Sequence, residues 1–96
     1  MFKAMWSEMN NAVIAGNKAA ALSYLSANAQ AKYGPVFDAL QSNYQGIVST
    51  LSPPMRGDIA GNIAEYFVVT PKGAGRAVFL IYFVKGLDGV WRLDSI

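Results

Sequence analysis

Few side chains in this sequence could carry acid–base chemistry, and the best group lies in its second half. Glu65, Arg92 and Asp94 combine two carboxylates with a cation, the kind of set that can donate and accept protons. On neighbouring strands the same residues would equally form ion pairs on an exposed or interfacial face, where such pairs contribute little stability. The spacing favours the structural interpretation, so we expect no catalytic residue.

Aromatic residues form a second group, and the chemistry they suggest is binding. An aromatic ring offers a large apolar surface, and a Tyr hydroxyl or a Trp N–H adds one hydrogen bond. We predict a ligand pocket lined by aromatic residues from both halves of the chain: Trp6, Tyr33, Phe37, Tyr66, Tyr82 and Trp91. The alternative interpretation is that these rings pack a core, with their hydroxyls bonded to the backbone.

Other chemistry is limited by residue types that the chain lacks. It contains no cysteine and no histidine, which rules out disulfides, His-based triads and His-ligated zinc. The acidic residues show no spacing typical of metal ligands, so we expect no metal site. The Gly-rich segments "KGAGR" and "GLDGVW" do not precede a helix, so they predict hairpin turns and no phosphate-binding loop. We therefore expect no cofactor.

Charge and hydropathy limit the partners. The net charge is only +2 and the basic residues are scattered, so we expect no nucleic-acid partner. No apolar run reaches the ~18 residues of a membrane span. Glu8 and Asn10 interrupt the apolar residues at the start of the chain, which does not resemble a signal peptide. The compartment stays open between the cytoplasm and export after removal of a leader.

The first half of the chain predicts helices that would carry part of the aromatic group. Apolar residues from Phe2 to Val13 recur at i, i+3 and i+4, with Glu8 and Asn10 on other faces. Gly16 is expected to end this helix and Asn17 to cap a short second one. A third helical segment follows from about residue 26 to residue 51, and a kink or a new start is expected at Pro35.

The second half predicts strands. Segments Ile59–Val69, Arg76–Val84 and Val90–Ile96 read as three antiparallel strands joined by two turns, and Gly89 supplies a positive φ in the second turn. An additional strand between residues 47 and 55 stays open. The sequence therefore predicts one α+β domain over residues 1–96, with a helical half at 1–52 and a sheet half at 57–96. In this fold, N-terminal helices pack on a curved antiparallel sheet of at least three strands.

The middle strand is apolar on both faces, which indicates that both faces are covered. A register that pairs Tyr66 with Leu80 and Tyr82 with Leu93 places Tyr66, Leu80, Tyr82 and Leu93 under the helices. The opposite face then has an apolar centre with charged residues around it, as protein interfaces do. We predict a homodimer through this opposite face, with these residues at the interface: Phe67, Phe79, Ile81, Phe83 and Arg92.

Two segments resemble a known superfamily. "MWSEMNNAVIAGNKAAALSYLS" contains a W-x-x-M-x-x-A helix, a G-N turn and an A-L-x-Y-L helix, and the chain closes on "DGVWRL". These features resemble the nuclear-transport-factor-2-like superfamily within the cystatin-like α+β group, and small uncharacterised bacterial members above all. The resemblance implies a pocket between sheet and helices and dimerisation through the sheet's outer face. It also implies that some members catalyse acid–base reactions with groups inside that pocket.

Three functions follow as expectations. The first is a small non-catalytic domain that binds a small apolar ligand or a protein partner and self-associates through its sheet. The second is a small acid–base enzyme of the isomerase or dehydratase kind, which needs a carboxylate in the pocket. The third is a structural accessory domain without a ligand. A ligand-binding domain predicts an open pocket of roughly 300 Å³ or more.

Overall fold

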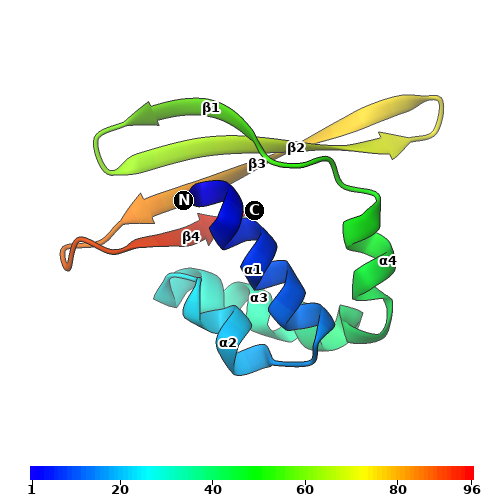
Figure 1. The fold of residues 1–96 in the computed structure, drawn as a ribbon, viewed down its shortest axis with the longest axis horizontal. Helices are drawn as coiled ribbons and strands as arrows, with labels where there is room; N and C mark the ends of the chain where they lie inside the picture. Colours follow the sequence, from blue (N-terminus) through cyan, green and yellow to red (C-terminus); the bar gives the residue numbers. More distant parts are fainter.

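The computed structural model describes residues 1–96 and has the predicted α+β architecture, with helices packed on one face of a curved antiparallel sheet (Figure 1). The sheet has four strands, in the order β1-β2-β3-β4. The elements are α1 (Phe2–Ile14), α2 (Lys18–Ser23), α3 (Ala27–Leu40), η1 (Gln41–Asn43), α4 (Tyr44–Ser49), β1 (Met55–Ala60), β2 (Ile63–Lys72), β3 (Gly75–Lys85) and β4 (Trp91–Ser95). No helix is long and apolar enough to cross a membrane.

The helix boundaries follow the local signals in the sequence. Gly16 adopts a φ of +77° just beyond α1, where only a residue without Cβ is unstrained. The side chains of Asn17 and Ser26 cap the next two helices by accepting hydrogen bonds from Ala20 N and Ala29 N, each at 3.2 Å. These caps confirm the predicted end of α1 and the predicted start of α2.

The third helical segment differs from its prediction at Pro35. Helix α3 runs through Pro35 from Ala27 to Leu40, with no new start at the proline. A proline there removes one backbone hydrogen bond. Tyr33 and Phe37 lie one turn apart on either side of Pro35 and are both buried, so their packing maintains the helix across it. The interruption comes later, where the 3-10 turn η1 separates α3 from α4.

The sheet contains one strand more than the three that the sequence made clear. The expected strand Ile59–Val69 is divided by a two-residue turn at Gly61-Asn62, and β1 pairs with β2 on the other side of it. Gly61 has a φ of +57° and Gly73, in the β2–β3 turn, a φ of +58°. A glycine with positive φ at the first central position suits a type II′ hairpin turn. The sheet therefore begins at Met55, slightly before the expected residue 57.

The predicted register is wrong by one residue on both sides of β3. Tyr66 pairs with Ile81 rather than Leu80, and Leu93 pairs with Phe83 rather than Tyr82. Side chains alternate between the two faces, so this shift places every β3 side chain on the face opposite to the predicted one. The side chains of β2 and β4 lie on their predicted faces. The β2–β3 turn is centred between Gly73 and Ala74 instead of on Gly73, which accounts for the shift.

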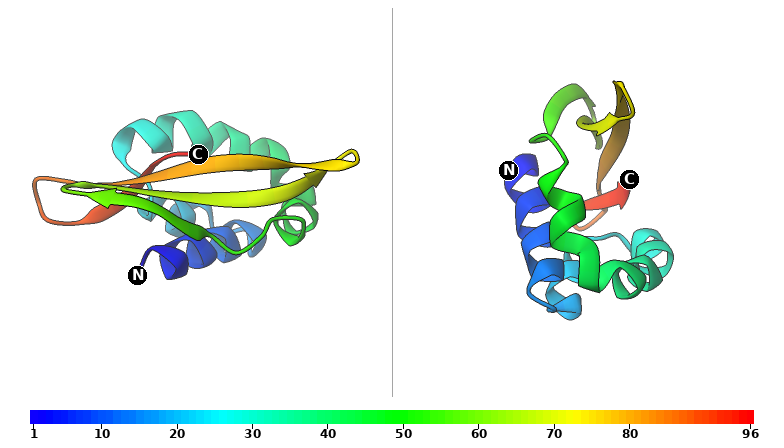
Figure 2. Two further views of the ribbon diagram at one scale, coloured as in Figure 1. Left: turned by 90° about the horizontal axis from the view of Figure 1, so that it is seen from above. Right: turned by 90° about the vertical axis from the view of Figure 1, so that its right-hand side faces the viewer.

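The core lies between the helices and the inner face of the sheet. Helix α1 contributes Phe2, Met9 and Val13, and the central strand contributes Ile81 and Phe83, all of them buried. No helix covers the opposite face of the sheet, as the two views of Figure 2 show. We call this surface the outer face. Its half-buried or exposed residues come from β2, β3 and β4: Ile63, Glu65, Phe67, Val69, Val78, Leu80, Tyr82, Val84 and Arg92.

Candidate functional site

A cavity of about 220 Å³ lies between the helices and the inner face of the sheet, and we call it the inner cavity. All but one of the residues that line it are hydrophobic. They come from α1, α3, α4, the two central strands and the segments beside them: Trp6, Asn10, Tyr33, Val36, Phe37, Leu40, Tyr44, Ile47, Val48, Leu51, Val68, Phe79 and Ile96.

Regular secondary structure positions most of this lining. Trp6 and Asn10 lie one turn apart on α1, as do Tyr33 and Phe37 on α3, so each pair projects from one face of its helix. Val68 and Phe79 are directly opposite each other on β2 and β3. These lining residues come from packed helices and from the middle of the sheet, so the inner cavity has a largely rigid frame.

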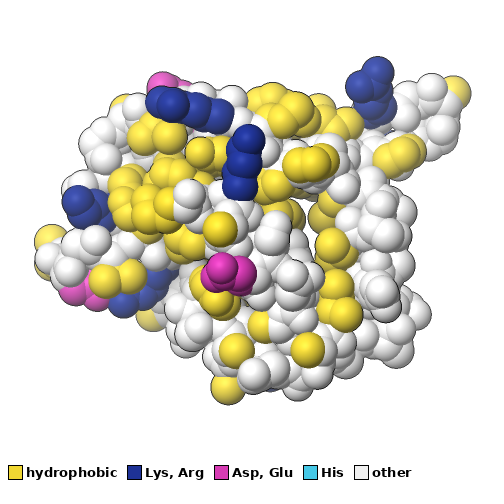
Figure 3. All heavy atoms as spheres, viewed as in Figure 1, with side chains coloured by type: hydrophobic (Ala, Val, Ile, Leu, Met, Phe, Trp, Pro, Cys, Tyr) yellow, Lys and Arg dark blue, Asp and Glu magenta, His cyan; other side chains and the backbone are white.

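A second concave region, the outer hollow, lies on the other side of the contact between α1 and α4. Its volume is about 340 Å³, and its polar lining includes Lys3, Ser7 and Asn11. Figure 3 shows the surface hollowed between α1 and α4, with hydrophobic side chains at its sides. The outer hollow and the inner cavity share four lining residues: Trp6, Asn10, Val48 and Leu51. These four residues form the wall between them.

The single polar side chain of the inner cavity is Asn10. Only 2% of Asn10 is exposed, and its Oδ1 accepts a hydrogen bond of 2.7 Å from the Tyr44 hydroxyl. The Nδ2 of Asn10 is buried without any hydrogen-bond partner, and it is the only such side-chain atom in the protein. Burial raises the pKa of Tyr44 to about 12, so its phenol stays protonated at neutral pH.

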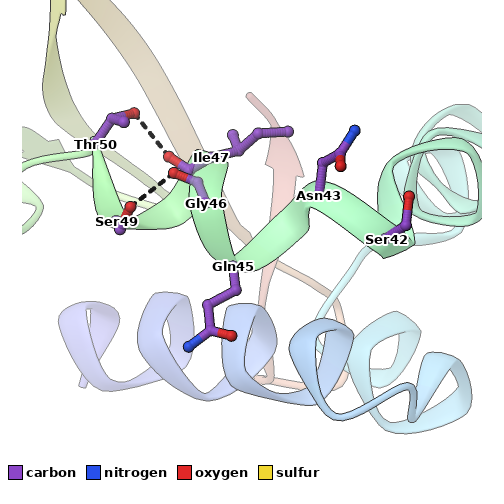
Figure 4. Close-up of a pocket in the computed structure, with 7 residues that line it drawn as sticks. All are labelled: Ser42, Asn43, Gln45, Gly46, Ile47, Ser49 and Thr50. Carbon is purple, nitrogen blue, oxygen red and sulfur yellow. Dashed lines mark hydrogen bonds between the residues drawn. The ribbon is translucent and has the colours of Figure 1, made fainter.

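Another depression, of about 810 Å³, lies along η1 and α4 and has a mostly polar lining (Figure 4). Two of its three hydroxyl groups already donate within the helix. Ser49 donates to the carbonyl of Gly46, and Thr50 donates to the carbonyl of Ile47, each at 2.7 Å. In Figure 4 the side chains of Gln45 and Asn43 point in different directions. This depression therefore lacks converging polar groups.

The structure places three of the six predicted pocket residues, Trp6, Tyr33 and Phe37, at the inner cavity. Tyr66 and Trp91 instead pack around Phe2 with ring centroids 5.4 and 5.0 Å from its own, and neither lines the cavity. Tyr82 lies on the outer face opposite Glu65, and hydrogen bonding to that carboxylate raises the pKa of the Tyr82 phenol. The reversed register of β3 explains the misplacement of Tyr82.

The reversal also corrects the predicted interface. Ile81 and Phe83 are core residues, 0% and 1% exposed, and cannot meet a partner across the outer face. Phe79 lies on the helix-facing side as well, where it lines the inner cavity and remains 45% exposed. Phe67 and Arg92 do lie on the outer face. Val78 and Leu80 occupy the outward positions that Phe79 and Ile81 were expected to fill.

The three candidate acid–base residues do not converge. Arg92 forms an ion pair of 2.8 Å with Asp88, Asp94 accepts a hydrogen bond of 2.6 Å from Ser26, and Glu65 lies beside Tyr82. No carboxylate lines the inner cavity. No group of three Asp or Glu side chains comes close enough together to hold a metal ion. The arrangement thus offers binding surface and one polar group, and no acid–base set.

Sequence reasoning missed two residues that line the cavity, Asn10 and Tyr44. The signal for Asn10 was its spacing, since it lies four residues after Trp6 and three before Val13, on the apolar face of α1. A polar residue on the apolar face of a helix is uncommon, so its burial is an informative signal. Tyr44 had helical spacing to Leu40, and only the packing of α4 against α1 brings its hydroxyl to Asn10.

No family model, no curated protein and no solved structure matches this chain. The resemblance to the nuclear-transport-factor-2-like superfamily therefore stays a prediction.

Proposed function

We propose that this protein is a non-catalytic binding domain whose inner cavity takes a small apolar ligand. The observation that carries this proposal is a cavity of about 220 Å³ with a single polar side chain in its lining. Three of its lining residues, Val36, Ile47 and Phe79, are 42%, 39% and 45% exposed, so the cavity is partly open to solvent. A volume of about 150 Å³ already suffices for benzene in an apolar cavity. A ligand that fills the cavity regains dispersion contacts that its walls lack when it is empty.

The volume limits the size of the ligand. At about 220 Å³ the inner cavity is smaller than the roughly 300 Å³ expected of a ligand-binding domain, so that expectation is not met, and the ligand can be no larger than about a substituted benzene. At ~0.5 kcal/mol per heavy atom, such a molecule gains ~4 to 5 kcal/mol, which corresponds to a Kd of about 0.2 to 1 mM. A natural ligand with additional polar contacts would bind more tightly.

Titration with ethylbenzene, followed by the amide shifts of ¹⁵N-labelled protein, tests the proposal. We expect saturable shifts in α1, α3 and the centre of β2 and β3. Val68→Phe places a ring in the cavity and should abolish binding, because Val68 is a buried part of its lining. Val90→Phe is the matched control, since Val90 is exposed in the β3–β4 loop. An absence of saturable binding to the wild type would contradict the proposal.

We also propose that the outer face is covered by a second copy of the chain. Ile63, Val78 and Leu80 expose 52%, 60% and 45% of their surface there, around the half-buried Phe67 and Val69. With strands of ~33 Å at a spacing of ~4.8 Å, the face covers roughly 500 Å² in each copy. Two such faces reach about 1,000 Å², the lower end of the range for specific interfaces.

A second copy also suits the charges on the outer face. It carries Glu65 and Arg92, so two copies related by a two-fold axis can bring opposite charges together. Light scattering provides the test. The wild type should be a dimer, and Leu80→Glu should make it a monomer, whereas Val90→Glu at an exposed loop position should not. A monomeric wild type, or a dimer that Leu80→Glu leaves intact, would rule out this surface.

We infer membership of the nuclear-transport-factor-2-like superfamily from the quoted motifs, and the order of helices followed by an antiparallel sheet supports it. No observation favours the acid–base enzyme, because no carboxylate lines the inner cavity.

A further inference from the structure

We propose that Asn10 and Tyr44 form a polar anchor in the inner cavity, which selects uncharged apolar ligands that carry one hydrogen-bond acceptor, such as a ketone or an aldehyde. This inference rests on the proposed function and specifies the chemical class of the ligand. It starts from the Nδ2 of Asn10, which has no hydrogen-bond partner and less than 1 Å² of accessible surface, so a ligand reaches it when the amide turns toward the cavity that Asn10 lines.

The pair has more donors than it can use. An Asn amide brings two N–H donors and a Tyr hydroxyl brings one O–H donor, and a single hydrogen bond of 2.7 Å joins the two side chains. Turning the amide over would let Nδ2 donate to the Tyr44 oxygen, but it would release the Tyr44 O–H and leave Oδ1 without a donor. The orientation in which Tyr44 donates to Oδ1 leaves fewer groups unpartnered, so the missing acceptor belongs to Nδ2 of Asn10.

A buried polar group without a partner is unfavourable, and native proteins rarely keep one without a reason. A ligand with an acceptor would complete the hydrogen bonding of Asn10, while its apolar part would fill the remaining space among Phe37, Leu40 and Val68. An apolar ligand of the same shape would fill that space equally well but would leave the donor unpartnered. The difference in affinity between two such ligands therefore measures the contribution of the hydrogen bond to the anchor.

The acceptor must be uncharged. No Lys or Arg lines the inner cavity, and Lys3 lines only the outer hollow. Transferring a carboxylate from water into an apolar cavity is strongly unfavourable unless a cation pairs with it. Fatty acids and other anions are thus poor candidates, and a carbonyl or ether oxygen fits the site.

Acetophenone and α-methylstyrene provide a matched pair of probes, because a C=O in one replaces a C=CH2 of similar shape in the other. We expect wild-type protein to bind acetophenone about two- to tenfold more tightly, the ratio expected for one net hydrogen bond. The Asn10 side-chain amide resonances should shift with acetophenone and stay nearly unchanged with α-methylstyrene. A ¹⁵N-edited titration with each probe measures both the affinity and the shift of the Asn10 side-chain amide.

Asn10→Leu combined with Tyr44→Phe removes the amide donors and the hydroxyl that Asn10→Leu alone would release, so it should abolish the preference while retaining binding of α-methylstyrene. Asn28→Leu replaces an amide with the same aliphatic side chain at an exposed position of α3 outside every cavity and should keep the preference. The amide resonances that vanish in the Asn10→Leu spectrum identify the side chain. If the combined variant does not fold, the two probes still decide the question in the wild type.

The outcomes separate this inference from the proposed function. Equal affinities for the two probes, or a preference that survives the combined Asn10→Leu and Tyr44→Phe change, would overturn the anchor and leave the apolar cavity as a binding site. Failure of both probes to bind would overturn the proposed function, and the anchor with it. Tighter binding of benzoate than of acetophenone at neutral pH would show that the site selects anions, contrary to the inference.

Discussion

The Tyr44 hydroxyl donates a hydrogen bond of 2.7 Å to Oδ1 of Asn10 across the interface between α4 and α1. The residues are far apart in the sequence, and both are buried beside the inner cavity. This contact joins α4 to α1 and leaves the Nδ2 amide of Asn10 without a partner. The contribution of this hydrogen bond to stability, the titration of Tyr44 and the role of Asn10 in binding can therefore be examined separately.

The first prediction concerns the titration of Tyr44. Its folded pKa of about 12 exceeds the ordinary value of 10.0, so folding favours the protonated phenol. This contribution to stability is fully present below pH 10 and is lost as the pH rises through 12. Hydrogen bonding to Glu8 and Glu65 also raises the pKa of Tyr24 and Tyr82. Ultraviolet absorbance of tyrosinate should therefore show late titration, and Tyr44→Phe should remove one tyrosine from the step near pH 12. A step near pH 12 of unchanged size in Tyr44→Phe would assign it to another residue.

The second prediction concerns the stability of the pair. Tyr44→Phe should destabilise the protein by ~1 to 3 kcal/mol, because it leaves Asn10 buried with no partner at all. Asn10→Leu together with Tyr44→Phe should recover most of that loss, since both polar groups are then gone. Urea unfolding of the two single variants and the double variant measures this coupling. Strictly additive free energies would show that the two side chains do not act together.

The third prediction compares two glycines. A Cβ at Gly57 would come within 2.9 Å of the Glu65 carbonyl oxygen, where β1 crosses β2 at an irregularity, so Gly57→Ala should destabilise the protein. A Cβ at Gly46 would meet no atom within 4 Å, and Gly46 lies within α4. Gly46→Ala should therefore stabilise by ~0.5 to 1 kcal/mol. Thermal unfolding should move the two midpoints in opposite directions, and equal shifts would refute the assigned positions.

The fourth prediction concerns acid. Hydrogen bonding to Arg92 and to the Val90 N–H holds the pKa of Asp88 below its ordinary value of 3.8. Its contribution to stability is present above that value and is lost as the pH falls through the lower folded pKa. Asp88→Asn should lower the urea midpoint slightly at pH 7 and leave it unchanged at low pH, where the carboxyl of the wild type is protonated. A difference that persists in acid would assign the effect to geometry instead of charge.

Much of the fold follows from local patterns. The apolar spacing of Phe2, Met9 and Val13 predicts the buried face of α1, and Gly16 with Asn17 marks the turn that follows. Such signals depend on neighbouring residues alone, so they hold before any tertiary contact exists. Part of the candidate site follows as well, because Trp6, Tyr33 and Phe37 project from the apolar faces of their helices into the inner cavity.

The orientation of β3 could not follow from its own residues. A strand that is apolar at every position from Ala77 to Val84 fits either face equally well, so only hydrogen-bonded pairing decides which side is inward. The β2–β3 turn has two residues instead of being centred on Gly73, and this difference placed every β3 side chain on the face opposite to the predicted one. Ile81 and Phe83 thereby entered the core, and Val78 and Leu80 became outward-facing.

The sequence by itself determined most element types, the cap at Asn17, the turns at Gly16 and Gly89 and the absence of thiol and imidazole chemistry, because each of these depends on residue type and near neighbours. Only the tertiary structure decided the strand register, the side chains on the sheet face that no helix covers, and the meeting of Asn10 with Tyr44. Those features depend on the packing of segments far apart in the chain. No spacing within one segment specifies that packing.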